Sequence, residues 1–205
     1  LVKQKAIDLE RSILRQDPDI LIFGEIRDAD SARAALAFAE SGHLVISTIH
    51  ANSVIQVSER FLSMIDPSHR ADSEFLIAHF LRMVVHQRLM RRLCSCARLM
   101  DNEEMEQLQA HTLRLTGGLI QARPGLKKKV GCTRCASTGY SGRVAAHETL
   151  HVPANEAMRA NFVRAFKNNE LELPIDLREE NGVEYTSRLE TLQTLMDQGL
   201  VDWLS

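Results

Sequence analysis

Several features that would assign this chain to a class of proteins are absent or scarce. Its 205 residues carry a net charge of −2, so no excess positive charge favours nucleic acid or an anionic membrane surface. No apolar run approaches the ~20 residues that a membrane-spanning helix needs, and no signal peptide or internal repeat is present. The chain is 44% hydrophobic and 25% charged, which is an ordinary composition for a globular protein. A chain of this length can bury a sizeable core.

The sequence also lacks the glycine-rich loop of the P-loop nucleotide hydrolases. That loop reads Gly-x-x-x-x-Gly-Lys-Ser/Thr, and its backbone amides and lysine hold the nucleotide phosphates. The nearest glycines, Gly117, Gly118 and Gly125, are not followed by Lys-Ser/Thr at the required offset. A complete phosphate-binding loop of this kind is therefore excluded within these residues.

Residues 17–52 contain the pattern around which the chain is organised. Two short apolar runs are bounded by turn signals, as in strands buried on both faces, and each ends in polar residues. The Ala-rich segment 30–40 between them ends before Gly42 and predicts a helix. Strand, helix and strand at this spacing predict a unit of a parallel sheet, in which ligands bind beyond the carboxyl ends of the strands. Glu25 and His50 should then lie at neighbouring strand ends and face one site.

These residue types suit nucleotide hydrolysis. A carboxylate directly after a buried strand, here Glu25, can orient and activate a water beside a magnesium-bound triphosphate. His50 could contact the terminal phosphate. The guanidinium fork of Arg27 matches phosphate oxygens, so Arg27 is a candidate for contact with phosphate or with a neighbouring subunit's site. Each residue taken alone also has an ordinary interpretation: a solvated carboxylate, a hydrogen-bonded cap and a surface ion-pair partner, respectively.

Two sequence segments resemble a known family. Residues 14–28 read LRQDPDILIFGEIRD and resemble the Walker B segment of the secretion ATPases, which drive type II secretion, type IV pilus assembly and related conjugation machines. Residues 42–52 read GHLVISTIHAN and resemble the His box of the same family. The resemblance implies that Glu25 is the catalytic base, and that Gly24, Arg27 and His50 belong to the nucleotide-binding site. Gly24 stands where many other P-loop ATPases keep an Asp.

The four cysteines fall into two close pairs, 35 residues apart: Cys94 with Cys96, and Cys132 with Cys135. Two tight turns that each supply two thiolates predict a four-cysteine zinc site. Disulfides and two unrelated pairs of buried thiols are the alternatives, although nothing in the sequence indicates an oxidising compartment.

The second cysteine pair extends the family resemblance. Residues 131–143 read GCTRCASTGYSGR and resemble the second half of the tetracysteine motif of the assembly-type enzymes. The first pair departs from that motif, because only Ser95 separates its cysteines where two residues are usual. The motif implies the assembly or secretion branch, since the retraction motors of the family generally lack it.

Periodicity and composition predict the remaining elements. We expect helices at 3–16, 52–65, 72–93, 102–115, 154–167 and 187–198, a strand at 143–150 and a mobile loop at 170–184. A basic cluster, formed by Arg88, Arg91, Arg92 and Arg98, is either a solvated face with ion pairs or a contact with a partner or a neighbouring subunit's nucleotide. The lysine triplet 127–129 should be solvated.

We therefore expect an α/β fold: the C-terminal half of a RecA-like P-loop ATPase core, with a tetracysteine zinc-binding insert and a helical C-terminal region. The expected domains are residues 1–93, 94–150 and 151–205. The resemblance implies a longer protein that uses ATP with Mg²⁺, keeps a structural Zn²⁺, and works as a cytoplasmic hexamer on an inner-membrane platform protein, without direct contact to nucleic acid. This chain alone, without the phosphate-binding loop, should not hydrolyse ATP.

Two other classes of function remain open. The chain could be a non-catalytic adaptor or degenerate paralogue that keeps the ring and zinc surfaces, and the missing phosphate-binding loop is the feature that discriminates. A zinc-ribbon nucleic-acid binder is the third class. The acidic net charge and the scarcity of aromatic residues for base stacking argue against it.

Overall fold

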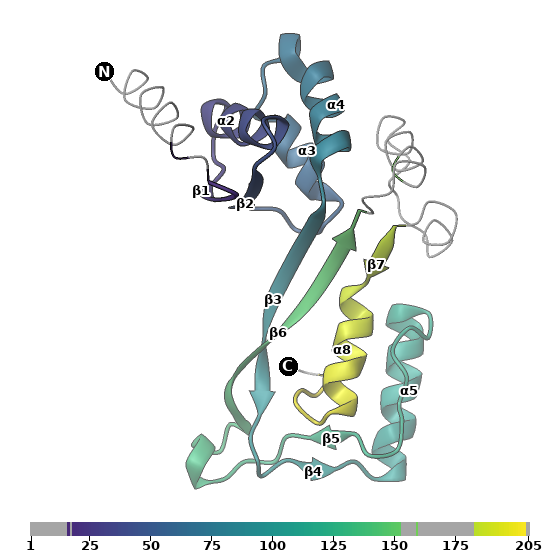
Figure 1. The fold of residues 1–205 in the computed structure, drawn as a ribbon. Coiled ribbons are helices and arrows are strands. Elements are labelled where there is room, and N and C mark those ends of the chain that lie inside the picture. The colour runs from purple at the N-terminus through teal and green to yellow at the C-terminus, as the bar shows by residue number, and fades with distance from the viewer. Residues whose placement is uncertain (1–15, 17, 153–158, 160–182, 204–205) are drawn as a thin grey trace. The chain divides into compact units, whose positions relative to one another are not determined.

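A computed structural model describes most of the chain and divides it into two units. The described residues are 16, 18–152, 159 and 183–203. Unit 1 comprises residues 1–84 and 150–184, and unit 2 comprises residues 85–149 and 185–205 (Figure 1). The helices predicted at 3–16 and 154–167 lie outside the described residues, apart from one residue in each, as does nearly all of the loop predicted at 170–184. No helix in the described part is long and apolar enough to cross a bilayer.

Unit 1 contains the predicted strand–helix–strand pattern. Strand β1 (Ile20–Glu25) runs parallel to β2 (Leu44–Thr48), and helix α2 (Ala29–Glu40) connects them. A capping box starts α2: the Asp28 carboxylate accepts from the Ser31 backbone N–H at 2.8 Å, and the Ser31 hydroxyl interacts with the Asp28 backbone N–H. The prediction of a parallel unit is confirmed.

One part of that prediction is wrong, because β1 and β2 are half-buried on one face and exposed on the other. The half-buried face packs on α2, where Ala32 and Ala35 form a small core with Ile26 and Ile65. The other face leaves four apolar side chains 49% to 84% exposed: Ile20, Ile22, Leu44 and Ile46. Apolar side chains alternate to both faces of a strand, and among the described residues a second layer covers only one of them.

Two predicted helices are corrected by the structure. The helix expected at 52–65 is shorter, with α3 at Gln56–Leu62. A short 3-10 turn, η1 (Pro67–His69), leads into α4 (Arg70–Phe80), and residues 83–93, expected to continue that helix, form strand β3 (Met83–Leu93). The change occurs at Leu81, whose φ of −60° and ψ of 130° are extended. Two β-branched residues then follow, of which Val84 is buried and Val85 exposed, which is the period-2 pattern of a strand.

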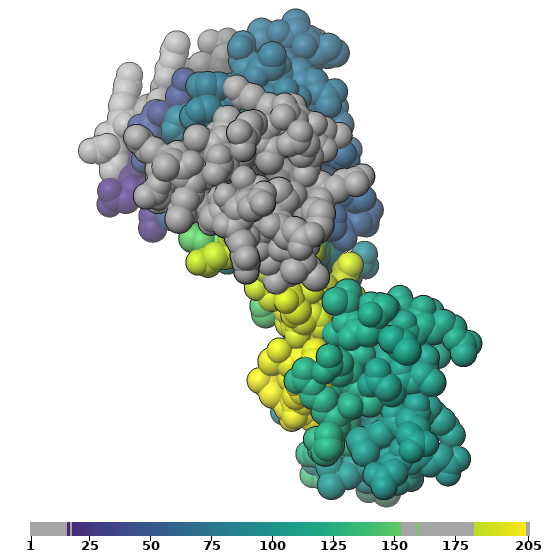
Figure 2. Space-filling view, turned by 90° about the vertical axis from the view of Figure 1, so that its right-hand side faces the viewer, coloured from purple at the N-terminus to yellow at the C-terminus, as the bar shows by residue number. Residues whose placement is uncertain are grey.

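In unit 2, a sheet and two helices enclose the larger core. Strands β3, β6 (Tyr140–His151) and β7 (Glu184–Thr186), most of whose residues lie in unit 2, form one sheet in the order β3-β6-β7. Helices α5 (Asn102–Thr116) and α8 (Arg188–Asp197) confirm the helices predicted at 102–115 and 187–198. Figure 2 shows the C-terminal segment with α8 (yellow) against the α5 region (teal). The core contains these buried residues: Leu108, Ile120, Leu126, Ala146, Leu195, Met196 and Val201.

The segment between the two cysteine pairs is closed by a small ladder. Strand β4 (Arg98–Leu99) pairs antiparallel with β5 (Lys127–Lys128). Between them, α5 starts in a capping box of Asp101 and Glu104 and ends at Gly117, whose φ of 61° is left-handed. A 3-10 turn, η2 (Thr133–Cys135), then carries the second cysteine pair. This local closure brings the two cysteine-bearing turns together.

Candidate functional site

The carboxyl ends of β1 and β2 bring Glu25 and His50 together in unit 1. Glu25 is the last residue of β1 and pairs in register with Thr48, the last residue of β2. His50 follows two residues later, and its Nε2 lies 3.0 Å from Oε1 of Glu25. The sequence prediction that these two side chains face one site is confirmed, while their chemical roles remain predictions.

Arg27 lies at the same site but contacts the other carboxylate oxygen. Its Nε donates to Oε2 of Glu25 at 2.7 Å, and its terminal amino group donates to the same oxygen. The hydrogen bonding from Arg27 is the largest cause of a lowered pKa of Glu25; desolvation opposes it, and the nearby charges of Arg27 and His50 lower the pKa further. The same pair raises the pKa of Arg27. Arg27, expected to bind phosphate, is therefore engaged in holding Glu25 ionised and oriented.

The backbone around Glu25 is held by the neighbouring strand. The Ser47 hydroxyl donates to the Gly24 carbonyl at 2.7 Å, and the backbone N–H of Ile26 donates to the Thr48 carbonyl at 2.8 Å. No atom of the described residues lies within 4 Å of the position that a Cβ on Gly24 would occupy, so packing does not require glycine there. Sequence reasoning missed Ser47, although a hydroxyl residue just before a strand end is a signal that could have found it.

This strand-end site is open. The side chain of Glu25 is 22% exposed, that of Arg27 75% and that of His50 92%. The two basic side chains can contact one side of an anionic ligand, and the carboxylate can orient a water. They do not by themselves enclose a triphosphate, which agrees with the absence of the glycine-rich loop from the sequence.

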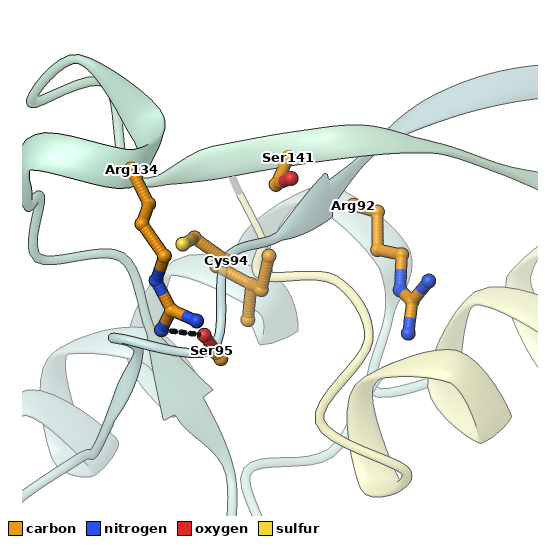
Figure 3. Close-up of a pocket in the computed structure, with 6 residues that line it drawn as sticks. Arg92, Cys94, Ser95, Arg134 and Ser141 are labelled. Atoms are coloured by element: carbon orange, nitrogen blue, oxygen red, sulfur yellow. Dashed lines mark hydrogen bonds between the residues drawn. The ribbon is translucent and has the colours of Figure 1, made fainter.

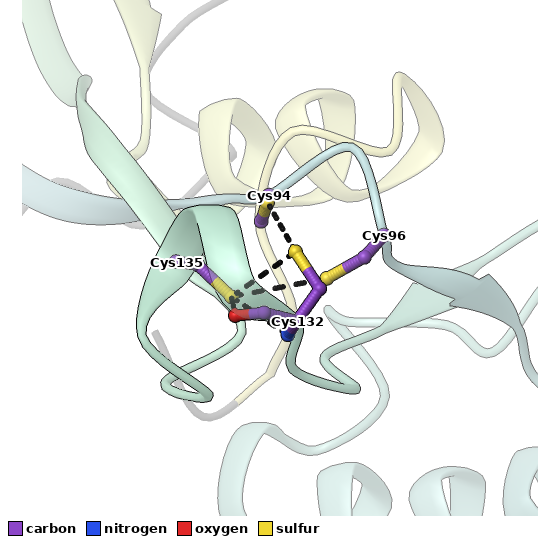
Figure 4. A group of neighbouring side chains, drawn as sticks. All are labelled: Cys94, Cys96, Cys132 and Cys135. Carbon is purple, nitrogen blue, oxygen red and sulfur yellow. Dashed lines mark hydrogen bonds between the residues drawn. The ribbon is translucent and has the colours of Figure 1, made fainter.

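The four cysteines form a second candidate site, in unit 2. Their sulfur atoms all lie within 4.8 Å of one another, although the two pairs are 35 residues apart (Figure 4). The Sγ–Sγ distances are 3.9 Å for Cys94 and Cys132, 3.9 Å for Cys96 and Cys135, and 3.8 Å for Cys132 and Cys135. A zinc ion about 2.3 Å from each of four tetrahedral sulfurs would separate them by about 3.8 Å, so the donor set fits zinc. All four thiols are free, which excludes the disulfide alternative in this structure.

Backbone amides support the charged form of two of these sulfurs. Sγ of Cys135 accepts from the backbone N–H groups of Cys132 at 3.1 Å and Gly139 at 3.3 Å. The Cys132 sulfur accepts from the backbone of Cys135, and this hydrogen bond, together with the neighbouring thiols, lowers the pKa of Cys132 to about 6. The backbone of Gly131 lowers the pKa of Cys96, but burial and the neighbouring thiols outweigh this effect and raise that pKa to about 11. Since the thiolate is the metal-binding form, metal uptake here would release protons.

Cys-X-Cys spacing does not keep the first pair out of the cluster. The backbone N–H of Ala97 donates to the Cys94 carbonyl at 2.9 Å and closes a tight turn. The Cys94 N–H donates to the Gly139 carbonyl at 2.9 Å and ties this turn to the segment after the second pair. Ser95 is left exposed at the tip of the turn, where it accepts a hydrogen bond from Arg134.

Part of the predicted basic cluster has structural partners. Arg98 and Lys128 both bind the carboxylate of Glu104, so this lysine is not simply solvated as expected. These hydrogen bonds, that of Lys128 contributing most, lower the pKa of Glu104 to about 2. The Arg91 guanidinium lies 4.2 Å above the centre of the Tyr140 ring, a cation–π contact.

Sequence reasoning also missed a buried polar group in the β3-β6-β7 sheet. Glu148 is 4% exposed, and its Oε1 accepts from the Tyr185 hydroxyl at 2.7 Å. Its Oε2 lies 3.7 Å from Nδ1 of His86, and neither of these two atoms has a hydrogen-bond partner in the described structure. Because the three residues come from three strands, no local pattern could have revealed them.

Comparison with known proteins defines the class to which the chain belongs. The family model described as "Type II/IV secretion system protein" matches residues 2–196, so the chain belongs to this family. The family predicted from the motifs of residues 14–28 and 42–52 is confirmed.

Individual relatives include proteins of two kinds of machine. The chain is 42% identical over 143 residues to the type IV pilus assembly ATPase PilB of Thermus thermophilus, covering 69% of this chain and 15% of that protein. It is 37% identical over 157 residues to the type II secretion system protein E of Pectobacterium carotovorum, covering 76% of this chain and 28% of that protein. The chain thus spans about a quarter or less of the length of these relatives.

Solved structures share the fold at lower identity. The pilus retraction motor PilT with bound ADP superimposes with a TM-score of 0.60 at 24% identity, covering 97% of this chain and 41% of that one. The ATPase DotB of Legionella pneumophila also gives 0.60, at 19% identity, covering 96% of this chain and 40% of that one. These likenesses support the predicted α/β fold of the secretion ATPases.

Proposed function

We propose that this chain is the C-terminal part of an ATPase motor in which Glu25 is the catalytic base. The observation that carries the proposal is the position of Glu25 at the carboxyl end of β1, with both carboxylate oxygens held by neighbouring side chains. The names of the relatives, a pilus assembly ATPase and a type II secretion protein, support the same reaction class.

Each residue of the strand-end site has a definite task in this proposal. Arg27 keeps Glu25 ionised, so that Glu25 can accept a proton from the attacking water. His50, 3.0 Å from the other oxygen and 92% exposed, is placed to contact a terminal phosphate. Gly24 adds no side chain beside the nucleotide. Mg²⁺ would supply charge neutralisation at the phosphates, and the glycine-rich loop would come from a longer protein.

The wider assembly forms part of the same proposal. We infer a homo-oligomer, expected to be a hexamer, that works at the cytoplasmic face of the inner membrane on a platform protein of a secretion, pilus or conjugation machine. The four-cysteine site holds a structural zinc that keeps its two turns together. The domain partition at 1–93, 94–150 and 151–205 belongs to this proposal as well.

The test is ATP hydrolysis by the longer gene product that contains this chain. We expect Glu25→Gln to lower the turnover rate by about 10²- to 10⁴-fold while nucleotide still binds, since the general base is lost. Glu40→Gln, an exposed carboxylate at the end of α2, is the matched control and should leave the rate unchanged. Equal rates for Glu25→Gln and the control would refute the assignment.

The 205-residue chain provides a second arm. Without the glycine-rich loop it should not turn over ATP. Hydrolysis by this chain alone that disappears in Glu25→Gln would show that the phosphate cradle is already complete.

One observation favours a second candidate, a non-catalytic adaptor. The sequence contains no Gly-x-x-x-x-Gly-Lys-Ser/Thr, and the cysteine cluster shares no residue with the strand-end site. If the longer gene product also lacks ATP turnover, while its cysteine site binds zinc, the adaptor is the correct function.

A further inference from the structure

A cavity of about 220 Å³ lies beside the cysteine cluster in unit 2, and its lining is strongly cationic. Its walls include two arginines and two serines and no acidic residue; they are Arg92, Leu93, Cys94, Ser95, Arg134 and Ser141. Leu93 and Cys94 are buried, while the arginines and serines are exposed. In the view of Figure 3, Arg92 and Arg134 lie on either side of Cys94, with Ser95 below and Ser141 above.

The two arginines of this cavity differ from the other arginines nearby. Arg98 is neutralised by Glu104, and Arg91 stacks on Tyr140. Among the described residues, Arg134 donates only to the Ser95 hydroxyl, and Arg92 makes no hydrogen bond or ion pair. The cavity therefore presents two guanidinium groups whose charge no carboxylate of its lining balances.

We propose that this cavity binds a phosphate group. Two guanidinium forks and two hydroxyls can donate more hydrogen bonds than the two oxygens of one carboxylate can readily accept. A phosphate offers three or four oxygens in a tetrahedral arrangement, and bidentate arginine contacts are the strong, charge-assisted kind. The donor set thus selects phosphate over carboxylate, whether the phosphate is free or part of a lipid headgroup.

The cysteine cluster positions two of the four donors. Ser95 lies between Cys94 and Cys96, and Arg134 directly precedes Cys135. The clustering of the four sulfurs fixes the two turns that carry Ser95 and Arg134. Because these donors are already ordered, less conformational entropy is lost when a ligand binds.

A competing explanation must be separated from this proposal. Four thiolates around a divalent zinc carry a net charge of −2, and the same arginines could serve only to balance that charge. In that case, their removal would weaken zinc binding, and added phosphate would find no site.

The experiment titrates the zinc-loaded 205-residue chain with inorganic phosphate at constant ionic strength and follows the backbone amide of Ser95 by NMR. We expect saturable binding that Arg92→Gln and Arg134→Gln each weaken by about tenfold or more, since hydrogen bonds to charged groups are lost. Arg88→Gln, an exposed arginine of the same strand as Arg92 but outside the cavity, should leave binding unchanged. Zinc content should stay the same in all three variants.

Two further measurements, competition by acetate and binding to lipid vesicles, decide the class and source of the ligand. Acetate at equal ionic strength should not compete. Sedimentation with phosphatidylglycerol vesicles, but not phosphatidylcholine vesicles, in an Arg92-dependent manner would identify a lipid headgroup, and binding of free phosphate alone would identify a small molecule. Absent phosphate binding, equal competition by acetate, an Arg88→Gln effect as large as the others, or zinc loss in the two cavity variants would overturn the proposal.

Discussion

The strand-end site of unit 1 and the cysteine cluster of unit 2 are built in opposite ways. At the strand ends, the three side chains are 22% to 92% exposed and come from residues at or just beyond the ends of two different strands. In the cluster, four sulfurs from two tight turns approach within 4.8 Å and are buried or half-buried. The cysteine cluster therefore contains all four ligands that a zinc ion needs. The strand-end site presents only one side of a larger site.

Packing in the two units shows the same difference. The β1-β2 pair of unit 1 has a core on one face and exposed apolar side chains on the other. The sheet of unit 2 packs on α8, and its core includes fully buried Ile120 and Leu126. Substitutions in unit 2 should therefore lower the stability of the fold more than substitutions at the strand-end site. Four predictions test that contrast.

The largest expected effect is the loss of the metal site. Cys132→Ser should reduce bound zinc from about one ion per chain to nearly none, because it removes one of four ligands. Structural zinc sites contribute apparent binding free energies of about 10–16 kcal/mol, so unit 2 should unfold at a much lower temperature. Metal analysis and calorimetry measure both. Thr133→Ala, in the same turn, is the control, and a wild-type chain that binds no zinc would contradict the prediction.

A smaller effect is expected at the buried carboxylate of unit 2. Tyr185→Phe removes the hydroxyl that donates to Glu148 at 2.7 Å and leaves a buried oxygen without that donor. The free energy of unfolding should fall by about 1–3 kcal/mol, measured by urea denaturation. Glu184→Gln, at an 84% exposed side chain next in sequence, should change it by less than about 0.5 kcal/mol. Equal effects of the two substitutions would show that the Glu148 contact contributes nothing.

The third effect is a pH dependence at Glu104, whose pKa Lys128 and Arg98 lower to about 2 from an ordinary value of 4.5. The folded-state pKa is depressed, so the carboxylate stabilises the fold fully above about pH 4.5 and loses that contribution as the pH falls towards 2. Glu104→Gln should therefore lower the melting temperature slightly near pH 7. The difference from wild type should shrink between pH 4.5 and 2, and a difference that does not vary with pH would rule out the ion pair as its cause.

The smallest effect is expected at the strand-end site. Arg27→Gln should raise the pKa of the Glu25 carboxyl towards its ordinary value, because the Arg27 hydrogen bond is the main cause of its lowering. His50→Gln should raise that pKa less, since His50 contributes only through its charge. Carboxyl ¹³C NMR titration measures both, with Arg33→Gln on α2 as control. A larger shift in the His50 variant would reverse the roles assigned to the two side chains.

The prediction of α4 and β3 shows where sequence reasoning was insufficient. The apolar residues from Phe75 to Leu89 fit a helix well enough, yet the helix ends at Phe80. The remaining residues are a strand because β6, which begins at Tyr140, 47 positions after the last residue of β3, supplies the hydrogen-bonding partner. A periodic pattern cannot report a partner so distant in the chain.

The sequence by itself determined the family, the strand–helix–strand unit around Glu25 and His50, and the grouping of the four cysteines. These depend on signals within a few residues: apolar runs, the Ala-rich segment that ends before Gly42, and the spacing of two thiols in one turn. Only the tertiary structure decided that Arg27 holds Glu25, that Glu104 joins Arg98 to Lys128, and that Arg92 and Arg134 line one cavity. The physical reason is that hydrogen bonds and ion pairs depend on distances in space. The order of residues in the sequence does not specify those distances.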